Sequence, residues 1–200
     1  MRIDRWAGLT VLLLGLASPV PAQEPAQSAR AGKAAAVAQA MDDAMTPGAG
    51  QKRLEPMVGS FDVKILTWVD PSKKPVESKA VSINTWMLDG RYIQSMLSGY
   101  VLDEPFNGIG YTAYDNPSKT YQTAWMDTGS TGMVWYRGGF DASGKSATMK
   151  GSVTNAVTGA PSPVELRLSI GADGGHTTQL WGQGPGNKMV KLMELHYTRK

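Results

Sequence analysis

The chain has 200 residues, of which 42% are hydrophobic and 18% are charged, and its formal net charge is +3. This length and composition are sufficient for one domain with a packed core and are unlike those of a disordered chain. Basic pairs lie far apart in the sequence, so no stripe for binding nucleic acid is expected. The absence of cysteine excludes disulfides, thiolate catalysis and cysteine-based zinc sites.

The first 22 residues have the pattern of a signal peptide. Arg2 and Arg5 form a basic start, residues 6–17 are apolar, and small residues precede a cleavage position after Ala22. The apolar run is shorter than the about 20 residues that a membrane-spanning helix needs. We therefore expect a mature protein that is periplasmic or secreted, with no membrane span after cleavage.

The next segments lead into the main domain. Residues 23–31 are rich in Ala, Gln and Pro and are predicted to be a disordered tether. Residues 32–56 are predicted to form a short N-terminal helix and a lead-in, with Pro47-Gly48 ending the helix. This helix either lies on the following domain and closes one end of it, or is a loosely held arm. Its apolar residues recur at helical spacing: Ala34, Val37, Ala38, Met41, Ala44 and Met45.

From residue 57 to the C-terminus, apolar stretches of about eight to twelve residues alternate with turn signals. Asp89-Gly90 is typical of a two-residue hairpin turn. The predicted strands are Gly59–Val69, Lys79–Leu88, Arg91–Leu102, Gly108–Asp115, Thr120–Asp127, Gly132–Phe140, Ala147–Thr154, Val164–Ile170, His176–Gly182 and Lys188–Arg199.

Short connections between these strands favour antiparallel pairing. About ten strands in succession predict an all-β domain over residues 57–200, a single antiparallel up-and-down β-barrel whose closure removes exposed edges. The alternative is an open sandwich of two sheets. A barrel of this size has room for one small ligand. Neither face of the last strand is purely polar, which is typical of a barrel with polar groups on part of its interior or with a partly covered outer face.

A series of motifs runs in order along residues 41–200. They include Gly59-Ser60-Phe61, Trp86-Met87-Leu88-Asp89-Gly90-Arg91-Tyr92, Pro105-Phe106-Asn107-Gly108, Tyr111-Thr112-Ala113-Tyr114-Asp115-Asn116, Tyr121-Gln122-Thr123-Ala124-Trp125-Met126-Asp127, Ser130-Thr131-Gly132-Met133, Gly139-Phe140-Asp141 and Tyr197-Thr198-Arg199. In these motifs the chain resembles the bacterial domain-of-unknown-function family 1579, which is grouped with the calycins. The resemblance implies a lipocalin-like barrel and supplies no function.

Two positions depart from the pattern of these relatives. Calycins typically open with Gly-x-Trp, where this chain has Phe61 in place of the tryptophan. The resemblance implies that Phe61 packs against Arg199 near the barrel's end, as a weaker cation–π partner than tryptophan. The family often has a histidine where this chain has Gln51, so a function that depends on that histidine is not expected here.

Polar residues beside aromatic ones mark a candidate ligand site. Asp127, Ser130 and Thr131 are hypothesised to line the barrel mouth next to Trp125 and Met133, where they would bind the polar part of a ligand whose apolar part enters the barrel. The alternative is a tight turn in which the Asp and Ser side chains bond the local backbone, and this interpretation is favoured.

Three further residues are ligand-binding candidates. Arg91 follows a predicted turn and is suited to a bidentate pair with a carboxylate or phosphate. A surface ion pair of Arg91 with Asp89 or Asp115 is the favoured interpretation. Trp86 and Tyr121 complete the set.

Glu194 and His196 lie two apart on the last strand and therefore share a face. If that face looks inward, they form an acid/base pair or bind a polar head group, and His196 is a possible haem or metal ligand. A surface Glu and a satisfied His are favoured instead. His176 follows a Gly-rich turn and is expected to be exposed. One His and one Glu are too few for a metal site, and no metal or cofactor is predicted.

Three functions follow from these observations. The leading hypothesis is a non-enzymatic carrier or sensor of a small amphipathic or apolar ligand in the cell envelope, with a cavity of roughly 300–1,000 Å³. The second is an enzyme whose acid/base groups, drawn from Glu194, His196, Asp127 and Tyr121, converge on one pocket in the barrel. The third is an envelope protein that binds another protein through an exposed apolar patch or through its N-terminal helix.

Overall fold

The computed structural model describes the secondary structure of residues 24–200 and the side chains from Ser28 onward. The chain divides after Ala40 into two units, of which the second is Met41–Lys200. The predicted signal peptide, residues 1–22, lies outside the described residues.

The first helix, α1, runs from Glu24 to Met45. The prediction of a disordered tether at residues 23–31 is therefore wrong from residue 24 onward. Ala, Gln, Glu and Arg predominate in that stretch and favour a helix, and Pro25 lies in the first turn, where proline is tolerated. The apolar side chains Val37, Met41 and Met45 are exposed. No described helix combines the length and the apolar character needed to cross a membrane.

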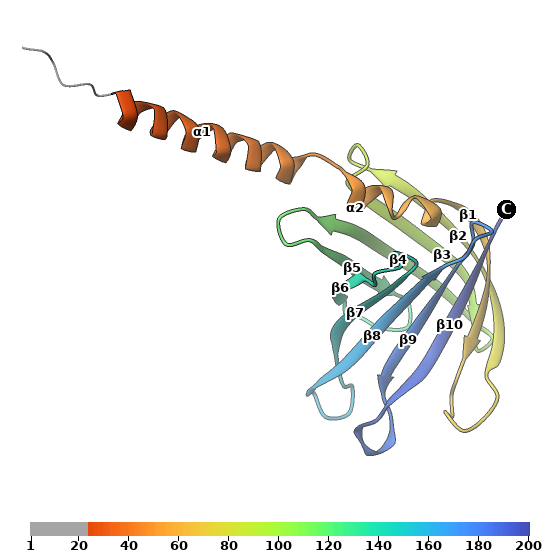
Figure 1. Ribbon diagram of the computed structural model, residues 1–200. Helices are drawn as coiled ribbons and strands as arrows, with labels where there is room; N and C mark the ends of the chain where they lie inside the picture. Colours follow the sequence, from red (N-terminus) through yellow and green to blue (C-terminus); the bar gives the residue numbers. More distant parts are fainter. Residues whose placement is uncertain (1–23) are drawn as a thin grey trace, which may run out of the picture. The chain divides into compact units, whose positions relative to one another are not determined.

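A short helix, α2 (Ala49–Lys52), and a 3-10 turn, η1 (Glu55–Met57), cover one end of the barrel, here called the helical end (Figure 1). The Gly48 backbone N–H donates to Gln51 Oε1 at 2.7 Å, which caps α2. The buried Leu54 packs in one core cluster with Ile93 and Tyr121. This end is thus closed by the lead-in.

Ten antiparallel strands follow and form one closed barrel (Figure 1). Each strand pairs with its neighbours in sequence, and β10 pairs with β1, so the predicted up-and-down barrel is confirmed and the open sandwich is excluded. The strands are β1 (Gly59–Thr67), β2 (Val76–Met87), β3 (Tyr92–Val101), β4 (Glu104–Asp115), β5 (Thr120–Asp127), β6 (Val134–Phe140), β7 (Ser146–Thr154), β8 (Pro161–Ile170), β9 (His176–Gln183) and β10 (Met189–Arg199), with a 3-10 turn η2 (Pro185–Asn187) before the last.

Two turns differ from the prediction. The Asp89-Gly90 sequence lies in a four-residue loop, because Met87 pairs with Tyr92. The two-residue turn instead joins β3 to β4 at Leu102-Asp103, where both residues have positive φ, 53° and 67°. Positive φ at both central positions is the geometry of a type I′ hairpin, usually formed by Asn or Gly. Leucine rarely adopts this geometry, so the turn carries no local sequence signal. As a result β4 begins four residues before the predicted strand.

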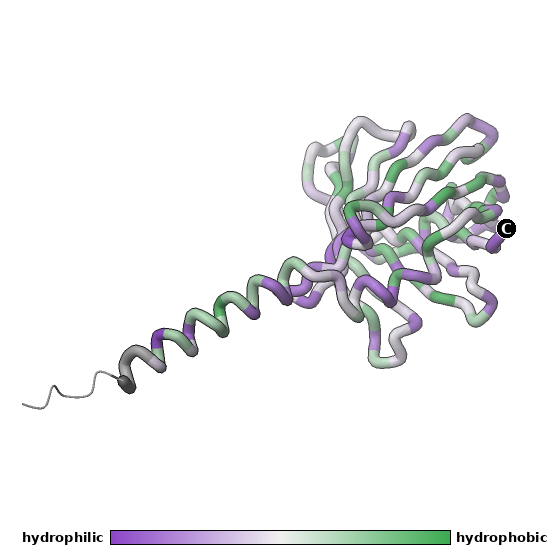
Figure 2. Tube along the Cα trace, turned by 90° about the horizontal axis from the view of Figure 1, so that it is seen from above, coloured by the Kyte–Doolittle hydropathy of each residue, from purple (hydrophilic) through white to green (hydrophobic). Residues whose placement is uncertain are grey.

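Hydrophobic and hydrophilic residues are interspersed along the barrel (Figure 2), and strand register fixes which of them point inward. On β1 the buried Phe61, Val63 and Ile65 point into the barrel. Their partners on β10 are Arg199, Tyr197 and Leu195, which share the inward face. The residues between these, including Glu194 and His196, therefore face outward.

His176 is buried and not exposed as predicted, with 5% of its surface accessible. Its ring stacks on Tyr197, with centroids 4.0 Å apart, and meets the edge of Phe61 at 4.9 Å. Residues 171–173 of the turn before it are exposed, but Gly175 is already buried, and the register pairs His176 with Tyr197 and so directs the imidazole inward.

Candidate functional site

The end of the barrel opposite the helical end, here called the far end, has an inward-facing apolar wall. Its side chains come from five consecutive strands, β3 to β7, and all are only partly buried although they point toward the barrel axis. Partial exposure of inward apolar side chains means that empty space or solvent adjoins them. We call these apolar side chains, together with the inward-facing Asp127, the inner rim; it comprises Val101, Phe106, Trp125, Asp127, Val134 and Val153.

Trp125 is the largest side chain of the inner rim. Its indole lies directly over β4, where a Cβ on Gly108 or Gly110 would come within 2.3 or 2.8 Å of ring atoms. The ring can occupy this position only because both facing residues are glycines. Its Nε1 donates to Asp127 Oδ2 at 2.7 Å, which orients the indole.

Asp127 brings a carboxylate to this apolar surrounding. Its Oδ1 accepts from the Gly129 backbone N–H at 2.9 Å and its Oδ2 from Trp125. Each carboxylate oxygen has a second lone pair, so the group retains capacity for up to two further donors. Burial, and then the negative charge of Asp127, raise the pKa of Tyr136 to about 12. The buried Tyr136 therefore stays a neutral phenol beside the carboxylate.

The loop after Asp127 behaves as the favoured interpretation predicted, as a local turn. Ser130 Oγ donates to the Gly132 carbonyl at 3.3 Å, and Asp127 caps the Gly129 N–H. Ser130 and Thr131 are exposed, and Met133 lies on the outer surface and not in the barrel. Of the predicted cluster, the structure brings together Trp125 and Asp127 at the inner rim.

Beneath the inner rim lies a cavity of about 30 Å³. Its walls include Thr112, Thr123 and Thr178 besides apolar side chains, and the Thr112 and Thr123 hydroxyls are hydrogen-bonded at 3.0 Å. A cavity of this size holds about one water molecule. This cavity is much smaller than the predicted interior cavity of roughly 300–1,000 Å³, because aromatic side chains and Met149 occupy the space around it.

Trp86, Arg91 and Tyr121 lie toward the helical end and anchor the lead-in. The Trp86 indole donates to Glu55 at 2.9 Å, and the Tyr121 hydroxyl donates to the Gly50 carbonyl at 3.0 Å. Arg91 donates to the backbone carbonyls of Leu88 and Met45. These three predicted ligand contacts are thus occupied by the chain itself.

Gln51 also has a structural part at this end. Its amide donates to the Tyr114 carbonyl at 3.0 Å and to Asn116 Oδ1 at 3.2 Å, while its oxygen caps α2. The buried side chain thus ties α2 to β4.

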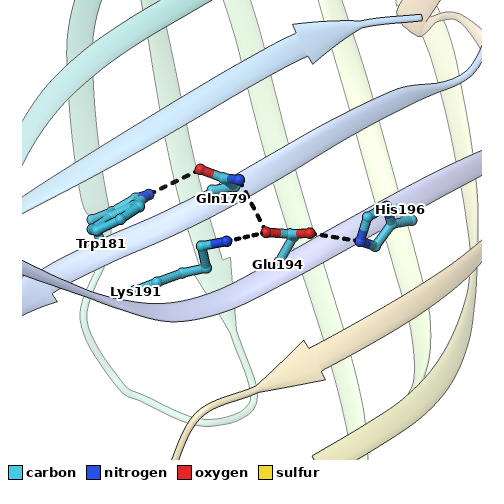
Figure 3. Close-up of polar contacts among 5 residues, drawn as sticks. All are labelled: Gln179, Trp181, Lys191, Glu194 and His196. Atoms are coloured by element: carbon cyan, nitrogen blue, oxygen red, sulfur yellow. Dashed lines mark hydrogen bonds and ion pairs between the residues drawn. The ribbon is translucent and has the colours of Figure 1, made fainter. Parts of the chain in front are cut away.

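Glu194 and His196 form an outward-facing network on β9 and β10 (Figure 3). His196 Nε2 lies 2.7 Å from Glu194 Oε1, and Gln179 and Lys191 both donate to Glu194 Oε2. Burial by itself would raise the pKa of Glu194, but the hydrogen bond and charge of Lys191, with His196 and Gln179, lower it below its usual value. The carboxylate is therefore an ion with its partners in place.

The proposed acid/base site inside the barrel is accordingly wrong for these two residues. They point away from the interior, and neither lines the cavity or the inner rim. Trp181 also belongs to the network, because its Nε1 donates to Gln179 Oε1 at 3.1 Å. The guanidinium carbon of Arg167 lies 4.1 Å from the centroid of the Trp181 ring. Among residues 28–200, no three His, Asp or Glu side chains gather as a metal ion would require.

Phe61 and Arg199 are brought together at the helical end. The guanidinium lies 5.1 Å from the Phe61 ring centroid and donates to the carbonyls of Val58 and Pro56 at 3.0 and 3.1 Å. Arg199 thus links β10 to the lead-in over a buried aromatic ring.

Several inward-facing residues are not among the candidates that the sequence motifs indicate. Leu166, Leu180 and Met193 point inward below the rim and are only partly buried. Val153 and Phe106 lie at the rim itself. The alternation of apolar residues in each strand was a usable signal, but the inward phase of each strand became known only from the register.

The family described as "Protein of unknown function (DUF1579)" matches residues 46–199. No curated protein matches the chain. Among solved structures, the barrel is similar to the "Crystal Structure of Rv2717c from M. tuberculosis", with a TM-score of 0.58 and 13% sequence identity. The similarity covers 78% of this chain and 99% of that one. At this identity the likeness concerns the fold alone.

Proposed function

We propose that this chain, which belongs to the DUF1579 family of proteins of unknown function, is a non-enzymatic binder of a small amphipathic molecule at the inner rim of its barrel. The observation that carries the proposal is the inward apolar wall that remains partly exposed: Val101, Phe106, Trp125, Val134 and Val153. Covering such a surface with an apolar ligand releases about 25 cal/mol per Å² of apolar area.

The position of the ligand follows from the size of the interior. The cavity below the rim is about 30 Å³, so the apolar part of the ligand lies mainly between the rim side chains. Leu180 and Met193 belong to the same clusters of apolar side chains as Trp125 and are partly exposed. Rotamer changes of the flexible Met193 would deepen the site.

The chemistry of the head group follows from Asp127. Its carboxylate stands among apolar side chains and accepts from Trp125 and Gly129, with room for a further donor. A ligand with an ammonium or another strong hydrogen-bond donor therefore suits the rim, and an anionic head group meets repulsion. We expect a positively charged or donor-bearing amphiphile to be preferred.

A competition titration tests this proposal. The protein is loaded with the neutral dye Nile red, which is then displaced by decylamine or by decanoate, both below their micellar concentrations. We expect decylammonium to displace the dye at about tenfold lower concentration, since a charge-assisted hydrogen bond contributes roughly 1.5 kcal/mol. Asp127→Asn should remove most of this difference, whereas the exposed turn variant Asp141→Asn should leave it unchanged.

Trp125→Phe provides a second readout, because its indole forms part of the wall and reports on it by fluorescence. Weaker dye binding in this variant, with unchanged unfolding by circular dichroism, would support the site. Equal displacement by the two amphiphiles, or the same preference in Asp127→Asn, would refute the assignment of the head group. Failure of the dye to bind at all would refute the ligand site.

We also propose that the barrel is of the calycin kind and that the protein is exported. The contact of Phe61 with Arg199 supports the first proposal, since the resemblance implied this pair. The basic, apolar and small-residue segments of residues 1–22 support the second. Mass spectrometry of the protein from its native cell envelope should find a chain that starts at Gln23. A chain that retains residues 1–22 there would refute cleavage.

A further inference from the structure

One part of the outer wall of the barrel is free of charge. On β3, on β5 and on β4 from Pro105 to Ala113, no described outward position holds Asp, Glu, Lys or Arg. The outward positions of β8 and β10 instead include Glu165, Arg167 and Lys191. Solvent-facing positions of a barrel usually include charged residues, so an uncharged outer surface indicates an interaction site.

This uncharged wall carries an apolar ridge. Register places Ile83 of β2, Met96 of β3, Ile109 of β4 and Met126 of β5 side by side in one row across four strands. Ile83 and Met96 are 54% and 52% exposed. The ridge therefore projects from the wall toward solvent.

An apolar hollow of about 390 Å³ lies beside the ridge. Its floor includes the small side chains of Ala113 and Ala124, which are outward neighbours on β4 and β5. Tyr111 and Trp135 rise beside Ala124 from the adjoining strands, and Trp135 is 63% exposed. Small residues between large aromatic ones thus produce the depression. Ridge and hollow together are here called the outer face.

We propose that the outer face is the contact surface of a homodimer, in which the ridge of each copy enters the hollow of the other. A two-fold axis presents the same patch to itself, so a projection and a depression side by side become complementary on both sides of the axis. In such an interface a charged residue near the axis also faces its own copy. A face without charges avoids that repulsion.

Composition and size agree with a second copy as the occupant. Aromatic residues and methionine are enriched in interface cores, and Lys, Glu and Asp are depleted, as on this face. The outer face extends over parts of five strands, β2 to β6, and Arg137 of β6 is a charged residue at its border. With strands spaced by about 4.8 Å and about seven residues of 3.4 Å each, the face spans roughly 24 by 24 Å in projection. This projected area of roughly 580 Å² is at the lower end of the about 600–1,000 Å² that each partner buries in a standard interface. Closed pairing of every strand leaves no edge for an added strand, so side chains alone make the contact.

Sedimentation velocity of the full chain over a range of concentrations tests the proposal. We expect a concentration-dependent dimer, and Met96→Lys on the ridge or Trp135→Lys beside the hollow should weaken it at least about tenfold. Both side chains are more than half exposed, so the monomer should keep its fold. Val157→Lys is the matched control, because Val157 is 94% exposed in the β7–β8 loop and should leave the dimer unchanged.

The chain has no cysteine, so engineered cysteines report contacts without interference. We expect a mixture of the Met96→Cys and Ala113→Cys proteins to form a disulfide-linked mixed dimer under mild oxidation. Val157→Cys mixed with Ala113→Cys should not. This result would identify the insertion of the ridge into the hollow, in addition to the oligomeric state.

A monomer at about 100 µM would overturn the proposal, since any Kd would then lie above that concentration. A dimer that both lysine variants leave intact would place the contact elsewhere and overturn it too. A monomer that floats with phosphatidylcholine vesicles, and loses this property in Met96→Lys, would assign the face to lipid instead. The Asp127→Asn variant should dimerise normally, so the proposed dimer and the proposed ligand site can be refuted independently.

Discussion

Acid should destabilise the fold through His176. Burial, and then the positive charge of Arg199, lower the pKa of His176 from 6.5 to about 4. Its Nδ1 has no hydrogen-bond partner, and burial also keeps its neighbour Tyr197 neutral by raising the pKa of that phenol. A protonated imidazolium at this position would be buried between aromatic rings beside a guanidinium.

The sign and the size of the stability change follow from the coupling of proton binding to folding. The neutral imidazole contributes its full stability above pH 6.5, where the unfolded chain is also neutral. As pH falls toward 4, the unfolded state takes up a proton that the folded state does not, so stability is lost. With these two pKa values, the loss from this group is about 2 kcal/mol by pH 5 and about 3 kcal/mol by pH 4.

Urea unfolding followed by tryptophan fluorescence at pH 7, 5 and 4 measures this loss. The variant His176→Phe removes the titration and retains a ring between Phe61 and Tyr197. Between pH 7 and pH 5 the stability of this variant should fall by about 2 kcal/mol less than that of the unchanged protein. Between pH 7 and pH 4 the difference should be about 3 kcal/mol. His196→Gln, at the other histidine, is the control and should retain the loss. Equal pH dependence of His176→Phe and the unchanged protein would refute the reasoning.

Three substitutions test the local geometry by the same unfolding assay. Leu102→Asn should stabilise the protein by about 0.5–1 kcal/mol, because asparagine tolerates the positive φ of this turn better than leucine; a loss of stability would argue against the turn geometry. Gly110→Ala should cost about 1–3 kcal/mol and shift the emission of Trp125, since the new methyl group meets the ring, whereas Gly139→Ala, with open space around it, should cost far less. Glu194→Ala should cost about 1–2 kcal/mol by removing the acceptor of the outer network, without changing Nile red binding; a change in dye binding would connect the network to the rim.

The strand count and the closed up-and-down order were predictable from the sequence. Turn residues such as Gly and Asp act locally, and an apolar period of two needs no knowledge of the partner strand. The turn at Leu102-Asp103 has no such signal, because leucine does not favour the positive φ that the turn requires. Tertiary pairing of Val101 with Glu104 enforces it.

The candidate site was predictable only in part. Trp125 and Asp127 were named together and do meet at the inner rim, because residues two apart on a strand share a face. Trp86 and Tyr121 were named for the same aromatic character, yet their polar atoms bond to Glu55 and Gly50 of the lead-in. Contacts between segments so distant in sequence carry no local signal.

The sequence by itself determined where the strands lie, since turn chemistry and alternation are local properties of the chain. Only the tertiary structure decided which face of each strand is inside. In β10 the register shifts between Lys191 and Met193, so the inward position passes from Val190, opposite Gly182, to Met193, opposite Leu180. A bulge of this kind reverses the alternation within one strand, and no single phase then fits the sequence. For that physical reason Glu194 and His196 could be read as lining the interior, although the closed barrel places them outside.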